Sequence, residues 1–82
     1  MARILYFAQL VEKLGLSSED LALPAGVTTV RGLLAHLRAR GPQWERYLAE
    51  ETVRVMVNRQ LVNLDAALPV EGEIAIVSTR PG

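Results

Sequence analysis

The spacing of apolar residues changes several times along this chain, and each change predicts the start of a new element. Runs of strand-forming residues, or an apolar residue at every second position, indicate extended structure. Five segments have one of these properties, namely residues 3–8, 19–24, 53–57, 61–62 and 74–77. Because proline lacks the backbone N–H that a central strand needs, Pro24 places residues 19–24 at the edge of a sheet.

A helical period predicts one main helix in the middle of the chain. Its apolar residues recur at the i, i+3, i+4, i+7 spacing of a buried stripe and are Val30, Leu33, Leu34 and Leu37. Thr28 or Thr29 can cap the start of this helix, since a threonine oxygen accepts from a free backbone N–H of the first turn. Gly41-Pro42 predicts its end.

Two weaker helical segments and one loop complete the outline. Residues 9–15 predict a short helix that ends at Gly15, and residues 43–50 predict a helical turn. Residues 58–60 predict a short loop between two strands. The resulting order predicts an α+β domain, in which one main helix packs on one face of a sheet of four to five strands.

Two of the predicted strands are apolar on both faces. Residues 3–8 and 74–77 carry almost no polar side chain on either alternation, which is typical of central strands that are covered on both sides. One long helix can cover only one face of a sheet. Either the short helix and the loops cover the second face, or that face is a docking surface for a partner.

Composition and charge exclude several classes of protein. The 82 residues suffice for one domain, and a hydrophobic content of 50% excludes a disordered chain. Nine basic residues balance nine acidic ones, so a nucleic-acid binder built on a basic surface is excluded. No apolar run approaches the ~20 residues of a membrane span. The absence of cysteine excludes a disulfide scaffold and fits a cytoplasmic location.

The side chains offer little for catalysis. His36 is the sole histidine and falls off the apolar stripe of the main helix, so we expect it to be solvated. Without cysteine or a second histidine, the chain lacks the usual ligand set of a zinc site, and we expect no metal. The serines have no base at a recognisable spacing. A small domain of this kind more often binds, carries or presents something than catalyses a reaction.

The remaining feature is the C-terminus of the sequence. We divide the chain into a folded domain over residues 1–77 and an extended tail over residues 78–82. Pro81 favours an extended conformation at Arg80. Such a tail reaches at most ~17 Å, at ~3.3 Å per residue. Because Gly82 has no Cβ, its carboxylate can enter a narrow channel, although an ordinary frayed end has the same sequence signature.

Several segments together resemble one known family. They are residues 4–10 (ILYFAQL), 29–34 (TVRGLL), 57–62 (VNRQLV), Leu68 and residues 72–76 (GEIAI). In this order and at this spacing they resemble the small subunit of molybdopterin synthase, in the MoaD/ThiS family of ubiquitin-like sulfur carriers. The similarity spans essentially the whole chain. It implies a β-grasp fold with a mixed sheet.

The resemblance also implies a function in which the chain supplies no catalytic side chain. In this family the C-terminal carboxylate, here that of Gly82, is adenylated by a ubiquitin-activating-like enzyme that uses ATP. Sulfur then replaces AMP, and the resulting thiocarboxylate donates sulfur to precursor Z in the large synthase subunit, within a heterotetramer. Phe7 and Val77 match positions on the family's partner-facing apolar surface. No bound cofactor, nucleic acid or membrane is expected.

The end of the sequence departs from the family pattern. The family ends in two glycines after an apolar tail, whereas this chain ends in Arg80, Pro81 and Gly82. We hypothesise that one more glycine follows Gly82, which would restore both the diglycine and the length. Two alternatives remain open: a carrier of the same fold for thiamin, tungsten cofactor or cysteine synthesis, and a non-reactive ubiquitin-like interaction module.

Overall fold

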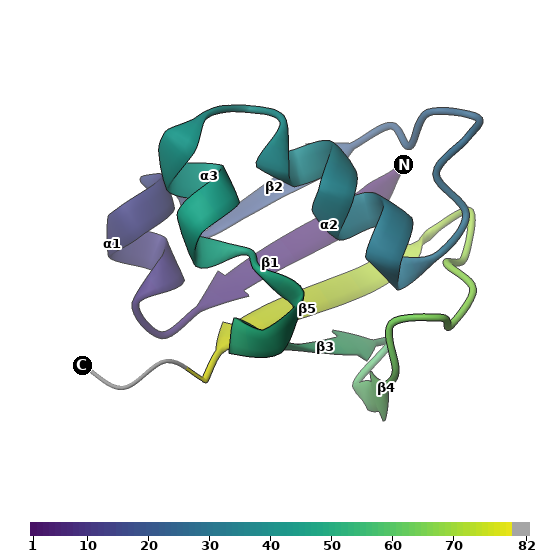
Figure 1. Ribbon diagram of the computed structural model, residues 1–82. Coiled ribbons are helices and arrows are strands. Elements are labelled where there is room, and N and C mark those ends of the chain that lie inside the picture. Colours follow the sequence, from purple (N-terminus) through teal and green to yellow (C-terminus); the bar gives the residue numbers. More distant parts are fainter. Residues whose placement is uncertain (80–82) are drawn as a thin grey trace.

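A five-stranded mixed sheet with helices over one face forms the body of the protein (Figure 1). The computed structural model describes residues 1–79. The strand order is β2-β1-β5-β3-β4, with β1 and β5 parallel and the other neighbours antiparallel. In chain order the elements are β1 (Ala2–Phe7), α1 (Leu10–Leu14), β2 (Ser18–Leu21), α2 (Val30–Arg38), α3 (Pro42–Tyr47), the 3-10 turn η1 (Glu50–Thr52), β3 (Val53–Val57), β4 (Gln60–Val62) and β5 (Gly72–Ser78). The predicted α+β class is confirmed.

The first and last strands occupy the centre of the sheet. β1 and β5 pair in parallel, with Phe7 opposite Val77, and each has a second neighbour on its other side. The central placement predicted from their apolar sequences is therefore confirmed. β2 lies at an edge, as predicted, but it ends at Leu21. Pro24 follows the strand, so its missing N–H leaves no gap in the ladder.

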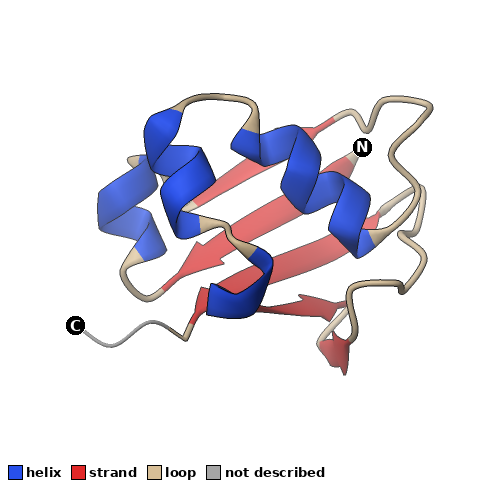
Figure 2. Ribbon diagram, viewed as in Figure 1, coloured by secondary structure: helices blue, strands red, loops and turns tan. Residues whose placement is uncertain are grey.

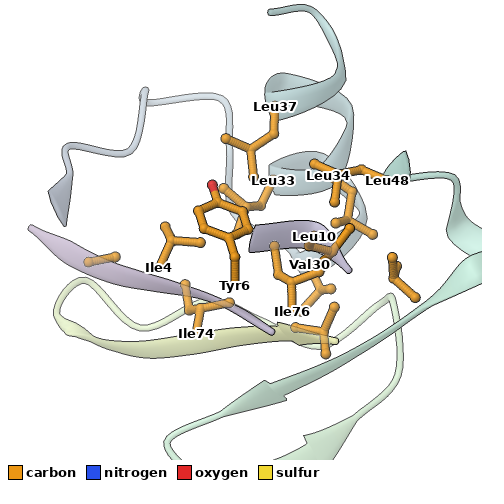
Figure 3. Close-up of a cluster of buried hydrophobic side chains, with 13 residues drawn as sticks. Ile4, Tyr6, Leu10, Val30, Leu33, Leu34, Leu37, Leu48, Ile74 and Ile76 are labelled. Carbon is orange, nitrogen blue, oxygen red and sulfur yellow. The ribbon is translucent and has the colours of Figure 1, made fainter. Parts of the chain in front are cut away.

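One hydrophobic core fills the space between the helices and the sheet (Figure 3). The four residues of the predicted helix stripe, Val30, Leu33, Leu34 and Leu37, all have no exposed surface. They face alternate residues of the two central strands, which are Ala2, Ile4, Tyr6, Ile74 and Ile76. Truncating a large side chain in such a core costs about 2–5 kcal/mol, so this contact fixes α2 against the sheet.

The ends of α2 match the predicted signals only in part. Thr29 caps the helix as expected, since its Oγ1 accepts from the N–H of Gly32 at 3.2 Å. The helix ends at Arg38, and Gly41-Pro42 begins the next one instead of merely ending this one. Proline suits the first position of α3 because that position has no intrahelical partner for a backbone N–H.

The connection from β3 to β4 is a two-residue turn. Asn58 and Arg59 both have positive φ, 48° and 71°, which fits the right-handed twist of a hairpin. Gln60, predicted to belong to this loop, is instead the first residue of β4. Asn58 also holds the start of β5, because its N–H donates to the Glu73 carbonyl at 2.8 Å and its Oδ1 accepts from the Glu73 N–H at 3.0 Å.

All three α-helices lie on the same face of the sheet (Figure 2). The short helix α1 packs beside α3 and does not cross to the other side. Of the two alternatives, the one in which the short helix covers the second face is therefore wrong, and the helices of residues 1–79 leave that face open. Within this part of the chain, no helix has the length and apolar character needed to cross a membrane.

Candidate functional site

The uncovered side of the sheet carries an apolar patch, which we call the open face. Strand register places its side chains, because residues paired across a ladder point to the same side. One row joins Leu5, Ala75, Met56 and Leu61, and a second joins Phe7 to Val77. The open face therefore consists of Leu5, Phe7, Met56, Leu61, Ala75 and Val77.

Several of these side chains remain accessible. Phe7 is 44% exposed and Leu61 is 68% exposed, while Leu5, Met56 and Val77 are half-buried. Burying such a surface against another protein is favourable, at about 25 cal/mol per Å² of apolar area. A contiguous apolar patch that includes an exposed aromatic residue has the chemistry of a protein-binding surface.

Arg54 is one of the charged side chains that border the open face. Arg54 pairs with Val77 in the β3–β5 ladder, so its side chain points to the open side, and it is exposed. A cation at the rim of an apolar patch favours a partner that brings a carboxylate to the same place. The sequence analysis did not single out Arg54, Leu5, Met56 or Leu61, because their position depends on the register of strands that are distant in sequence.

The C-terminal segment leaves the sheet beside this patch. β5 runs through Ser78, one residue beyond the predicted domain boundary, and Val77 is the paired neighbour of Phe7 at the end of β1. The two predicted partner-binding residues are therefore adjacent, as their Cα pairing requires. Figure 1 shows the chain leaving the sheet where β1 and β5 both end. The predicted site residues Arg80, Pro81 and Gly82 lie outside the described residues.

Two hydrogen bonds hold the last described residues. The side-chain amide of Gln9 donates from Nε2 to the Ser78 Oγ at 3.0 Å. The Thr79 N–H donates to the carbonyl of Thr52 at 2.9 Å. The start of the tail is therefore fixed to the β1–α1 turn on one side and to η1 on the other.

The strongest electrostatic cluster lies on the helix side of the sheet. The buried Tyr6 hydroxyl donates to Glu19 Oε2 at 2.7 Å, and Arg40 donates to both oxygens of the same carboxylate at 2.7 and 2.9 Å. Burial, reinforced by the Glu19 hydrogen bond, raises the pKa of Tyr6, and the Arg40 hydrogen bond lowers the pKa of Glu19. Only 2% of Tyr6 is exposed, so its hydroxyl joins elements and offers no access to a substrate.

The described residues supply no catalytic constellation. Residues 1–79 contain no cluster of three or more histidine, cysteine, aspartate or glutamate side chains that could hold a metal. His36, expected to be solvated, is half-buried on α2. A hollow of about 370 Å³ at the far end of the sheet, near Met1, Leu23 and Val70, is mainly apolar and contains no titratable side chain. The candidate site is therefore the open face together with the last described residues, Ser78 and Thr79.

Comparisons with known proteins identify the family and the fold. The model of the ThiS family matches residues 4–82. A structure from Pyrococcus furiosus described as molybdopterin converting factor, subunit 1, has a TM-score of 0.77 at 23% identity, and the match covers 96% of this chain and 97% of that chain. Among curated proteins, none matches this chain.

Two crystal structures of small archaeal modifier protein 1 from Haloferax volcanii are also similar. One has a TM-score of 0.76 at 23% identity, covering 99% of this chain and 97% of that chain. The other has a TM-score of 0.75 at 21% identity, covering 96% and 97%. At identities this low, structural similarity establishes the fold and not the function. The β-grasp fold expected from the resemblance is confirmed.

Proposed function

Because this chain belongs to the ThiS family of ubiquitin-like sulfur carriers, we propose that it is the sulfur-carrying small subunit of a molybdopterin synthase. One observation carries the proposal most directly: the open face meets the start of the tail at the Phe7–Val77 pair. A large subunit docked on the open face would receive the tail at the edge of the same interface. From Thr79, the three remaining residues span at most about 10 Å.

The chemistry assigned to Gly82 needs no side chain of this protein. Its carboxylate attacks the α-phosphorus of ATP in an adenylating partner, and pyrophosphate leaves. A sulfur nucleophile then attacks the acyl carbon, AMP leaves, and a thiocarboxylate remains. In the synthase, the thiocarboxylate sulfur is transferred to the pterin precursor. Rate acceleration comes from groups of the partner and from the position of the chain end. The folded domain contributes the surface that the partner binds.

Mass spectrometry tests whether the chain end is activated. The protein is incubated with an adenylating enzyme of this family, ATP and a sulfide source, in two forms: the sequence as given and the same sequence with one glycine appended. We expect the mass gain of one oxygen replaced by sulfur, and none without ATP or after deletion of Gly82. If both forms keep their mass while a known carrier is converted, the chain is a non-reactive interaction module.

A second measurement tests the pathway. The thiocarboxylated protein is mixed with a molybdopterin synthase large subunit and precursor Z, and the dithiolene product is assayed. Product formation supports the molybdopterin assignment. Thiocarboxylate that persists in this mixture, but is consumed in a thiamin, tungsten cofactor or cysteine pathway, assigns the carrier to that pathway.

A further inference from the structure

The hydrogen bonds around the last described residues have a role beyond folding. We propose that the Gln9 side chain and the Thr52 carbonyl form a clamp that sets the direction in which the tail leaves the sheet, and that Gln9 is thereby a positioning residue for activation of the chain end. The inference rests on the proposed function, because the clamp matters for chemistry only if the Gly82 carboxylate reacts.

The Gln9 side chain hydrogen-bonds to Ser78 and does not cap its own helix, α1. It occupies the N-cap position of α1, where a side-chain oxygen typically accepts from the first turn and contributes about 1 kcal/mol. The Gln9 side chain makes no such cap. Its amide instead reaches a residue 69 positions away, Ser78, in a partly buried hydrogen bond. The Gln9 carbonyl accepts from the Lys13 N–H at 3.0 Å, which holds the backbone in place.

The other side of the clamp is equally constrained. Thr52 lies in η1, whose turn is closed by two hydrogen bonds to the Ala49 carbonyl, from the Thr52 N–H at 3.0 Å and from its Oγ1 at 2.9 Å. The Thr52 carbonyl accepts from the Thr79 N–H just beyond the last pair of the β3–β5 ladder, Val53 with Ser78. The clamp therefore extends the fixed part of the chain by one residue past the sheet.

The clamp holds Ser78 and Thr79 in place. Without it, these two residues could fray from the end of the sheet, and each residue released allows about 3.3 Å more displacement. A displacement of about 1 Å at a reacting atom can cost up to 100-fold in rate. Loss of the clamp should therefore slow the chemical step while leaving docking of the folded body unchanged.

The test compares Gln9→Ala with Gln43→Ala, a matched loss of an exposed glutamine on α3. ATP–pyrophosphate exchange by the adenylating enzyme is measured over a range of carrier concentrations. We expect Gln9→Ala to lower kcat by about three- to tenfold with KM unchanged. Gln43→Ala should match the wild type, and all three proteins should share one melting temperature to within a few degrees.

A double variant tests whether Gln9 acts through Ser78. Ser78→Ala should lower kcat at least as much as Gln9→Ala does, and the double variant should be no slower than Ser78→Ala, since the Gln9–Ser78 bond is already lost in that variant. Unchanged kcat in Gln9→Ala, a rise in KM alone, or multiplicative effects would each overturn the proposal.

Amide hydrogen exchange tests the clamp without relying on the activity of the carrier. In Gln9→Ala, the Thr79 amide should exchange faster relative to that of Ile76 than it does in the wild type, and Gln43→Ala should leave this ratio unchanged. Unaltered Thr79 protection overturns the clamp even if the carrier is active. If neither the wild-type protein nor the form with one appended glycine supports exchange of pyrophosphate, the proposed function is contradicted, and the Thr79 amide then decides whether the clamp exists.

Discussion

The Tyr6 hydroxyl is a polar group in the core, and its hydrogen bond links neighbouring elements. Its ring packs edge-on against Trp44, with centroids 5.8 Å apart, and its hydroxyl donates to Glu19. Arg40 bonds the same carboxylate and lies over the Trp44 ring at 4.7 Å. One cluster thus joins β1 and β2 to the segment that leads into α3, at a point where an unpaired hydroxyl would be costly.

The Glu19 carboxylate gives this cluster a pH dependence. Arg40 holds the pKa of Glu19 below its ordinary value of 4.5. A group whose pKa is lower in the folded state contributes stability that is present above the unfolded pKa and is lost as pH falls through the folded pKa. Glu19→Gln should therefore reduce the free energy of unfolding by about 1–3 kcal/mol at pH 7, and by less in acid.

Urea unfolding at pH 7 and at a pH well below 4.5 measures this effect. Glu71→Gln is the matched control, because Glu71 is exposed in the loop before β5 and lies outside the helices of the described residues. A Glu19→Gln deficit of the same size at both pH values would show that lost packing, and not the charge, is responsible.

At the scale of elements, the β3–β4 hairpin contains a local conflict that a substitution can relieve. Arg59 adopts φ of 71°, a region that costs a residue with a Cβ about 1–2 kcal/mol. Asn58 tolerates its own positive φ better. Arg59→Gly should relieve this strain and raise the free energy of unfolding. The net gain should be only about 0.5 kcal/mol, because glycine loses more conformational freedom than arginine when the chain folds. Thermal melting checks this, and Gln60→Gly, placed in β4, should be destabilising.

At the start of β5, by contrast, the existing glycine cannot be replaced without crowding. Gly72 has φ of 159°, and a Cβ there would lie 2.8 Å from Pro69 Cγ and 3.0 Å from Asn58 Oδ1. Gly72→Ala should therefore destabilise the fold by about 1–3 kcal/mol in urea unfolding. Gly26→Ala is the control, since a Cβ at Gly26 meets nothing within 4 Å. Equal effects of the two substitutions would contradict the proposed crowding.

The elements that could be predicted from the sequence are those with a local signal. The stripe from Val30 to Leu37 needs only a helical period, and the central position of residues 3–8 follows from their apolar character on both sides. Gly41-Pro42 was ambiguous because the same dipeptide can end one helix and begin the next. The bond from Gln9 to Ser78 has no local signal, because it exists only once β1 and β5 are parallel neighbours.

In the candidate site, too, some residues could be predicted from the sequence and others could not. Phe7 and Val77 were accessible to sequence reasoning through the resemblance, and their strands were predicted. Met56 and Leu61 were missed, because only the β3–β4 and β3–β5 registers bring them to the same side as Phe7. Whether the second face was covered by the short helix or left open also depended on where that helix packs, which periodicity alone does not specify.

At the scale of the whole molecule, the fold separates stability from binding. The core lies between the helices and one face of the sheet, while the apolar patch lies on the open face. The parallel pairing of β1 and β5 brings the ends of both strands to one edge, where the chain also continues into the tail. Under the proposed function, this arrangement would place the docking surface next to the residues from which the tail starts.

Phe7→Asp tests this separation directly. Because Phe7 is 44% exposed and points away from the core, the variant should keep its circular dichroism spectrum and fold as a monomer. A buried charge in the apolar interface should weaken binding to a molybdopterin synthase large subunit by at least about 30-fold in titration calorimetry, the size of an interface hot spot. Val70→Asp, at a residue 87% exposed in the loop before β5, should leave the affinity unchanged. Binding that survives Phe7→Asp, or fails equally in Val70→Asp, would place the interface somewhere other than the open face.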